Sequence, residues 1–300
     1  MGNVRNILRI AKQWIFPPGV YNLFFWSYKK HLAALKVPVN IKKSHSLNAR
    51  FRNTHEGERC FILGSGPSVK KQNLAILEGE HCISMSRFYL HDKYDLIQPK
   101  YHVFAPNHHP YKFELPRENL EELERRTNWN QEIFICHTSY KYSYFELMKK
   151  QPAYALKNIS FINYIASVEL TEYNAYDEVI WDISKRPFLI RSALYACIQL
   201  ALFMGFKEIY LVGVDHDYLA ELNEDGSSTH FYQVAEGLND ADFYKDKEKL
   251  FFGFYKRWGH YRLMRTYAEK RGQRIFNASE KSYLDVFQRM KLEDVLRNSI

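Results

Sequence analysis

The sequence has few cysteines, and none of them is spaced as a metal or disulfide motif requires. Cys60, Cys82, Cys136 and Cys197 form no CxxC pair, and each lies inside an apolar run. This pattern predicts buried free thiols in a reducing compartment, and it excludes a disulfide framework and a cysteine-based zinc site.

Long apolar runs and long basic runs are missing as well. No apolar run reaches the ~18 residues that span a bilayer, and no apolar segment with a small-residue cleavage site follows the basic residues 1–12. We therefore expect no transmembrane helix, no secretory leader and a cytoplasmic location. The net charge of +8 is spread along the chain and is not gathered in a basic arm, which favours an anionic ligand or a membrane surface over a nucleic acid.

Residues 1–50 differ in composition from the rest of the chain. A short basic amphipathic helix is expected over residues 6–16, and Pro17-Pro18-Gly19 would end it. Trp26 then stands close to Lys29. Aromatic and basic side chains together are typical of a helix at the inner face of a membrane, although a helix that packs on the protein's own core is an alternative.

From residue 51 to residue 300 the sequence alternates between short apolar runs and helical segments. This pattern predicts one α/β domain, Rossmann-like, with a mostly parallel sheet and helices on both faces. A smaller lid region is expected within about residues 106–175 and 217–250. The expected strands cover residues 60–63, 81–85, 101–105, 132–136, 178–181, 208–214 and 273–277, and the expected helices cover residues 68–77, 189–204 and 245–271.

The clearest chemical motif is the turn Gly64-Ser65-Gly66-Pro67-Ser68, which follows the first expected strand. Glycine lets the backbone turn sharply and approach a ligand closely, and Pro67 suits the first position of a helix. The N–H groups and the dipole at a helix start favour a phosphate group. The turn therefore predicts phosphate or nucleotide binding, with a plain tight turn as the alternative; neither a full GxGxxG fingerprint nor a Walker lysine is present.

A second polar group follows the strand expected over residues 208–214. It contains Asp215, His216, Asp217 and Tyr218. Open α/β sheets bind their ligands at the carboxyl ends of strands. Asp215 and Asp217 could hold Mg²⁺ or a ribose and His216 could act as a base, whereas a solvated loop is the alternative.

Three further positions carry candidate chemistry. His230 lies between polar residues and the aromatic pair Phe231-Tyr232, a setting that could keep its imidazole neutral, as a general base requires, or that could simply let it cap a loop. Arg191 and Ser192 stand near the start of the helix expected over residues 189–204 and could bind an anion. Asn107 follows the third expected strand and could contact a base or a sugar.

Two stretches of the chain resemble the bacterial glycosyltransferase family 42 sialyltransferases. One is residues 60–94, with the glycine turn and Ser86-Arg87-Phe88-Tyr89, and the other is residues 192–215. The same landmarks, with His230-Phe231-Tyr232, are also similar to the domain-of-unknown-function 115 family, which includes archaeal 6-hydroxymethylpterin diphosphokinases. The resemblance covers about residues 58–290 and is more specific for the superfamily than for the reaction.

The resemblance to the sialyltransferases implies a donor site for a CMP-sugar. Gly64, Ser65 and Gly66 match the turn that contacts the nucleotide in that family. Ser86 stands where the family has an asparagine, and Asn107 lies near the place of a second one. Ser192, with Arg191 beside it, matches a serine near the donor carboxylate and phosphate.

The same resemblance implies which residues would carry the chemistry. Tyr218 and Tyr232 are loose matches to the paired tyrosines that hold the leaving phosphate. The family's catalytic histidine aligns with Tyr255, so a histidine elsewhere would have to replace it. The candidates for that replacement are His230, His216 and His260.

These observations predict a glycosyltransferase that takes an acidic sugar from a nucleotide-linked donor, plausibly CMP-linked, and transfers it to a surface glycan or glycolipid without a required cofactor. One alternative is a Mg²⁺-dependent diphosphokinase of the 6-hydroxymethylpterin type, with Asp215 and Asp217 on the metal. The other is a non-catalytic nucleotide-binding scaffold. The sequence is compatible with an oligomer.

Overall fold

The structure is a computed structural model of the chain. It describes residues 45–105, 114–137, 158–164, 178–185, 192–217 and 247–297, together with positions 24, 27, 28 and 187. The helix expected over residues 6–16 and most of the expected lid region lie outside these residues.

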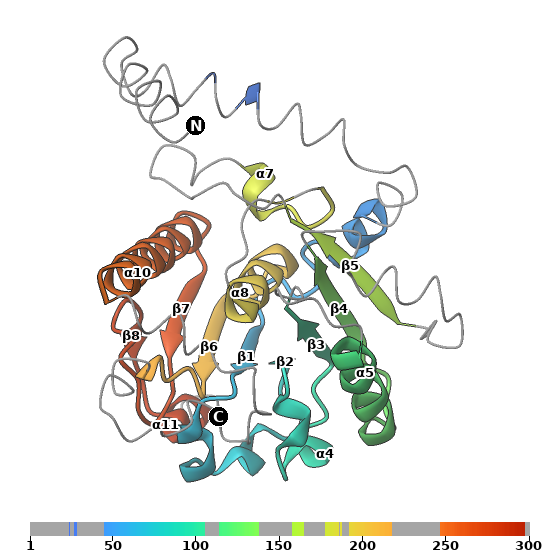
Figure 1. Cartoon of the computed structure of the whole chain (residues 1–300). Helices are drawn as coiled ribbons and strands as arrows, with labels where there is room; N and C mark the ends of the chain where they lie inside the picture. Colours follow the sequence, from blue (N-terminus) through green and yellow to red (C-terminus); the bar gives the residue numbers. More distant parts are fainter. Residues whose placement is uncertain are drawn as a thin grey trace.

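A single parallel sheet forms the centre of the fold, in the strand order β5-β4-β3-β2-β1-β6-β7-β8 (Figure 1). Each pair of neighbouring strands is parallel. The prediction of a Rossmann-like α/β fold is therefore confirmed. The strands are β1 (Arg59–Leu63), β2 (Cys82–Met85), β3 (Tyr101–Phe104), β4 (Glu132–His137), β5 (Ile159–Asn163), β6 (Glu208–Val212), β7 (Arg274–Asn277) and β8 (Gln288–Arg289).

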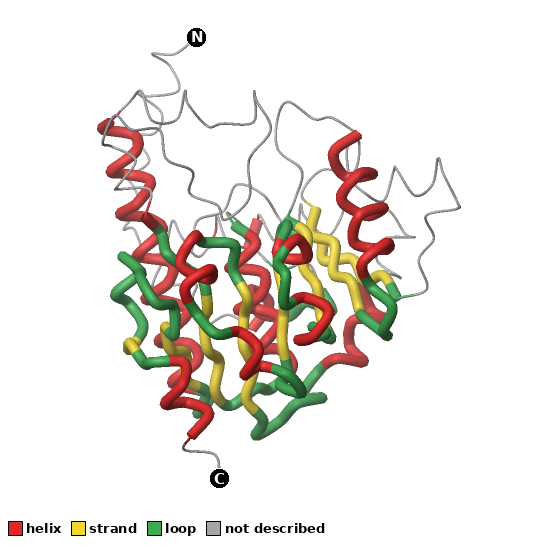
Figure 2. The backbone as a smooth tube through the Cα atoms, turned by 90° about the horizontal axis from the view of Figure 1, so that it is seen from below, coloured by secondary structure: helices red, strands yellow, loops and turns green. Residues whose placement is uncertain are grey.

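Helices cover both faces of this sheet (Figure 2). Cys60 and Ile62 of β1 are buried on the face of α7, α8 and α10, whereas Phe61 and Leu63 are buried on the other face, because side chains alternate along a strand. The α-helices are α4 (Tyr94–Ile97), α5 (Glu114–Arg126), α7 (Glu178–Trp181), α8 (Ala193–Met204), α10 (Lys247–Lys270) and α11 (Leu292–Arg297). The 3-10 helices are η1 (Asn48–Phe51), η2 (Pro67–Lys71), η3 (Leu74–Leu77) and η4 (Phe88–Leu90).

The helix α8 is the central helix of its layer. Every residue from Ala193 to Met204 is buried, which explains why the segment is apolar on all sides. It ends at Gly205, whose φ of 87° is the left-handed conformation that glycine adopts without strain. Because β6 begins only a few residues later, α8 runs antiparallel to the strands and begins at the carboxyl edge of the sheet.

Two of the expected elements are wrong. Residues 178–181 form the helix α7 and not the expected strand, and Trp181 stacks there on Tyr267 of α10 with ring centroids 4.2 Å apart. A short apolar run fits either structure, so its pattern does not distinguish them. Residues 68–77 form η2 and η3 in place of one helix, because the Asn73 side chain accepts the Ala75 N–H and starts a new turn.

Residues 45–50 belong to the domain. Asn48, in η1, is fully buried, and its side-chain amide donates to the carbonyls of Phe161 (2.8 Å) and Ile183 (3.0 Å). These bonds connect the edge strand β5 with the turn after α7. Among the described helices, none is both long enough and apolar enough to cross a bilayer.

Candidate functional site

The order of the strands changes direction at β1. From β1 the chain adds β2, β3, β4 and β5 on one side, and it then returns to place β6 on the other side of β1. In open α/β sheets the ligand crevice lies outside the carboxyl ends of the strands at such a point. The loops that follow β1 and β6 are Gly64–Ser68 and Gly213–Asp217, and they contain the two motifs predicted from the sequence to bind a ligand.

These two loops are joined through their backbones. The Gly64 N–H donates to the Val212 carbonyl (2.7 Å), and the Gly66 N–H donates to the Gly213 carbonyl (2.9 Å). A β-carbon on Gly64 would lie 2.5 Å from the Gly213 oxygen, and one on Gly213 would lie 2.1 Å from Cγ1 of Val69. The glycines are therefore required by the close approach of the two loops, whether or not a ligand is present.

Asp215 binds the start of η2. Its Oδ2 accepts the Ser68 N–H (2.8 Å) and its Oδ1 accepts the Ser68 hydroxyl (2.5 Å). Burial raises the pKa of Asp215, while the bonds from Ser68 act in the opposite direction. As expected, Gly66 precedes the helical turn and Pro67 is its first residue, but η2 is a 3-10 helix of only five residues. Because proline has no N–H, the first N–H of η2 is that of Ser68, and it is already bonded to the Asp215 carboxylate. Phosphate binding at this turn stays a prediction.

The start of α8 offers a longer helix at the same edge. Ser192 precedes it with extended backbone (φ −155°, ψ 159°) and makes no side-chain capping bond. Its hydroxyl oxygen is buried and has no hydrogen-bond partner within the part of the chain that the structure describes. Ala193 and Leu194 share a buried cluster with Met85, the last residue of β2, and with Val214, in the loop after β6.

His216 is turned away from solvent. It has a φ of 51°, and its Nε2 lies 2.8 Å from the hydroxyl of Tyr261 in α10. Burial lowers the pKa of His216 to about 3, with a smaller contribution from the nearby Arg257 cation. The imidazole is therefore neutral at physiological pH and is held against α10. Asp217, which follows it, is half-buried.

Ser86 directly follows β2 in a strained conformation, with a φ of 56°. Its carbonyl lies 3.1 Å from Nε2 of His102, whose Nδ1 lies 2.7 Å from the Ser84 hydroxyl. A carbonyl only accepts, so Nε2 carries the proton and Nδ1 is the acceptor. Burial lowers the pKa of His102 to about 3. His102 thus fixes the backbone at the end of β2. This role was missed from the sequence, where the one indication of it is a single histidine inside an apolar strand.

His260, a candidate replacement for the family's histidine, and Tyr255, which aligns with that histidine, both lie on α10. His260 is buried, and its ring lies 5.9 Å from that of Tyr195 in α8. Tyr255 is 69% exposed. Asn107, Arg191, Tyr218, His230 and Tyr232 lie outside the described residues, so the structure brings together only the glycine turn, Ser86, Ser192, Asp215, His216 and Asp217 at this edge.

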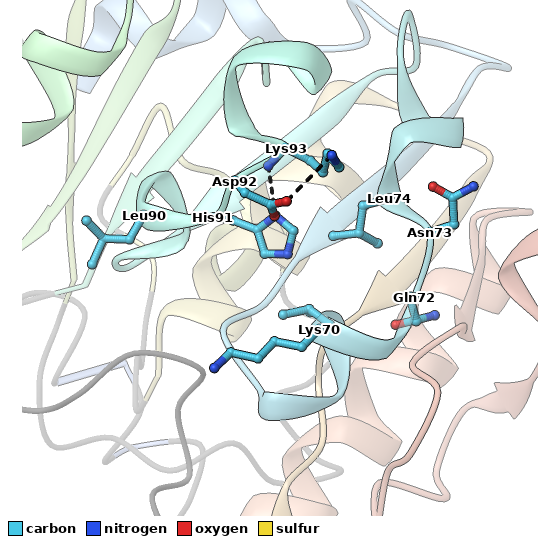
Figure 3. Close-up of a pocket in the computed structure, with 9 residues that line it drawn as sticks. Lys70, Gln72, Asn73, Leu74, Leu90, His91, Asp92 and Lys93 are labelled. Carbon is cyan, nitrogen blue, oxygen red and sulfur yellow. Dashed lines mark hydrogen bonds and ion pairs between the residues drawn. The ribbon is translucent and has the colours of Figure 1, made fainter.

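A separate hollow of about 450 Å³ lies beside η2, between it and the segment Leu90–Lys93. Lys70 and Lys93 lie on opposite sides of it, with His91 and Asp92 between them (Figure 3). The Nδ1 of His91 lies 3.1 Å from the Asp92 carboxylate. These residues lie within the stretch 60–94 that resembles the sialyltransferases, but none of them is a candidate site residue from the sequence.

Comparison with known proteins gives a likeness in structure only. No protein-family model and no curated protein matches the chain. The Campylobacter jejuni sialyltransferase CstII, in complex with the substrate analogue cytidine-5'-monophosphate, is 18% identical, with a TM-score of 0.41, over 78% of this chain and 85% of that one. CST-II with a trisaccharide acceptor and CMP is 17% identical, with a TM-score of 0.43, over 78% of this chain and 86% of that one.

A third solved structure is the monofunctional alpha-2,3-sialyltransferase Cst-I from Campylobacter jejuni. It is 16% identical, with a TM-score of 0.44, and the match covers 77% of this chain and 79% of that one. Likenesses at this level transfer no activity to the chain, so its function has to be inferred from its own residues.

Proposed function

We propose that the chain is a glycosyltransferase, sialyltransferase-like, that takes an acidic sugar from a nucleotide-activated donor. One observation carries the proposal. The motifs that resemble the sialyltransferases, far apart in the sequence, meet at the carboxyl edge of β1 and β6, where the strand order changes direction. That place is where a parallel sheet offers a ligand crevice.

The donor's anionic groups would bind at the start of α8. Ser192 has a buried hydroxyl oxygen without a partner in the described residues, and it precedes a helix of 12 residues. The N–H groups and the dipole of the first turn favour a carboxylate or a phosphate. Arg191 is adjacent in the sequence and would add a positive charge. The glycine turn Gly64–Ser68 would form the opposite wall, with Ser86 and Asn107 beside the base or sugar.

The reaction would be an inverting transfer. His230 would take the proton from the acceptor hydroxyl, whose oxygen would form the new bond to the anomeric carbon. The bond from that carbon to the donor phosphate would break, and the electron pair would leave with the phosphate. Tyr218 or Tyr232 would stabilise that leaving group, which needs no metal ion and no cofactor.

Two sets of contacts bear on which histidine is the general base and on whether Asp215 binds a metal ion. His216 faces Tyr261 and has a pKa of about 3, which makes it a weak base at neutral pH and favours His230. Both carboxylate oxygens of Asp215 accept bonds from Ser68, which favours a structural role over Mg²⁺ binding and so disfavours the diphosphokinase.

The donor would be CMP-linked and the acceptor a surface glycan or glycolipid. The basic, aromatic segment of residues 1–50 would bring the enzyme to the inner face of a membrane, where such an acceptor is anchored. The net charge of +8 suits both an anionic donor and an anionic membrane surface.

A calorimetric titration with CMP, CDP, UDP and ATP, in EDTA or in Mg²⁺, tests the proposal. CMP should bind equally well in both. Ser192→Ala should weaken CMP-sugar binding about tenfold, because a hydrogen bond to a charged group is lost. The control Thr266→Ala removes an exposed hydroxyl that bonds only within α10, and it should bind as the wild type does.

Turnover of a CMP-sugar by the same preparations completes the test. His230→Ala should abolish transfer and leave CMP binding intact. ATP binding that requires Mg²⁺ would contradict the transferase and support the diphosphokinase, and CMP binding without turnover of any acceptor would support the scaffold.

A further inference from the structure

The amino edge of the sheet carries a cluster of three side chains that could bind a metal, His55, Glu58 and His81. One atom from each lies within 4.8 Å of the other two. The Glu58 Oε2 lies 2.5 Å from Nδ1 of His55 and 2.9 Å from Nε2 of His81. Glu58 immediately precedes β1 and His81 immediately precedes β2, so the parallel pairing of these strands brings the two together.

His55 is the fixed member of the cluster. It is buried, its backbone N–H donates to the Met204 carbonyl (2.9 Å), and its ring stacks on Phe206 with centroids 4.4 Å apart. Its Nε2 lies 2.7 Å from the hydroxyl of Tyr101 in β3. A histidine ligand generally needs a hydrogen bond on its second nitrogen to fix the ring, and Tyr101 supplies it here.

The other two members are open to solvent. The side chains of Glu58 and His81 are 48% and 36% exposed, so an ion can reach the cluster. His81 also lines a hollow of about 470 Å³ together with Glu80, Asp95 and Lys100. The hollow therefore reaches one exposed member of the cluster.

We propose that His55, Glu58 and His81 bind one divalent transition-metal ion, Zn²⁺ in the first place, with a fourth coordination position open to solvent. Two imidazole nitrogens and one carboxylate oxygen are a donor set that zinc accepts in proteins. Ligands of a tetrahedral zinc ion lie about 3.4 Å apart, given zinc–ligand bonds of about 2.1 Å. Binding therefore requires the exposed Glu58 and His81 side chains to move outward, while His55 stays in place.

Proton positions adjust in the same step. Without the ion, Nδ1 of His55 donates to Glu58. With the ion, Nδ1 is a ligand, and the proton moves to Nε2, which donates to Tyr101. A tyrosine hydroxyl can accept or donate, so it stabilises either form of the ring. The site lies roughly 20 Å from the glycine turn, six residues away along β1 at about 3.3 Å per residue, and does not depend on the proposed transferase activity.

The test uses the full chain, stripped with EDTA and titrated with Zn²⁺ by calorimetry and with Co²⁺ by visible absorption. The wild type should bind one equivalent and develop the d–d bands of a nitrogen- and oxygen-coordinated Co²⁺. Glu58→Gln and His81→Ala should each lose at least tenfold in affinity. The matched control Glu56→Gln neutralises an exposed carboxylate two residues from Glu58 and should bind as the wild type does.

Two results would overturn the proposal. If the wild type takes up no Zn²⁺, the cluster is a hydrogen-bonded triad only. If both variants, shown to be folded by far-UV circular dichroism, keep the wild-type affinity and Co²⁺ spectrum, the ion binds elsewhere on the chain.

Discussion

At the carboxyl edge of the sheet, β1 and β6 end in glycine turns that touch through their backbones, whereas at the amino edge β1 and β2 begin beside polar side chains. The contact at the carboxyl edge requires residues without a side chain, because a β-carbon on Gly64 would collide with the Gly213 carbonyl and one on Gly213 would collide with Val69. The contact at the amino edge requires polar side chains, because the His55 ring is hydrogen-bonded to the Glu58 carboxylate and to the Tyr101 hydroxyl. Added atoms should therefore disrupt the carboxyl edge, whereas removed functional groups should disrupt the amino edge.

The largest effect is expected from Gly213→Ala. The new methyl group would lie 2.1 Å from Cγ1 of Val69, and residue 213 has a φ of 66°, which strains any residue other than glycine. We expect the free energy of unfolding to fall by about 3 kcal/mol or more, from overpacking and backbone strain together. Urea denaturation followed by circular dichroism measures it.

Gly272→Ala is the matched control, because Gly272 has a φ of 71° and no atom lies within 4 Å of the place that a methyl group would take there. It should cost about 1–2 kcal/mol from strain alone. If both variants lose the same free energy of unfolding, the loops after β1 and β6 can move apart at no cost, and their backbone contact is not a fixed feature of the fold.

The next effect is a dependence of stability on pH. Burial holds the pKa of His102 and of His216 at about 3 in the folded state, below the 6.5 of an unfolded histidine. A lowered pKa means that their contribution is complete above pH 6.5 and is lost as the pH falls. Each should lower the free energy of unfolding by about 1 kcal/mol between pH 6.5 and 5.5.

His102→Gln should remove its share of that pH dependence, measured by urea denaturation at the two pH values. For His55, at the amino edge, burial lowers the pKa, but the Glu58 carboxylate opposes the shift. His55→Gln should therefore flatten the pH dependence less than His102→Gln does. A larger change in His55→Gln would contradict the contrast between the two edges.

The smallest effect is expected from Tyr101→Phe. The hydroxyl lies 2.7 Å from Nε2 of His55, and its loss leaves a buried ring nitrogen unpaired. We expect about 1 kcal/mol of destabilisation and a Zn²⁺ affinity lower by about tenfold. Unchanged Zn²⁺ affinity, with the expected loss of stability, would show that Tyr101 is structural and does not orient a ligand.

The apolar strands could be predicted from sequence because both faces of the sheet are buried, which leaves runs such as Cys60–Leu63 without polar residues. The helix α7 could not, since Glu178–Trp181 is too short to show a period. At the site, the glycine turn was found from its residue types. The carboxylate of Asp215 on Ser68 was not, because the two are 147 positions apart and only the pairing of β1 with β6 brings them together.

The amino-edge cluster was missed for the same reason. His55, Glu58 and His81 are spaced by 3 and 23 positions, which matches no metal motif of regular spacing. Their proximity follows from the register of β1 and β2, in which Phe61 pairs with Cys82. A histidine directly before one strand and a glutamate directly before its neighbour would be the signal to look for, once the strand order is known.

The four cysteines give the folded protein a built-in reporter. Cys60, Cys82, Cys136 and Cys197 are all free and buried, on β1, β2, β4 and α8, and burial raises the pKa of each thiol. The native chain should therefore react slowly with a thiol reagent, and the rate of labelling should follow the rate at which the sheet opens. Mass spectrometry of each labelled cysteine would then measure separately when β1 and β2, β4, and α8 become exposed, with no probe added to the sequence.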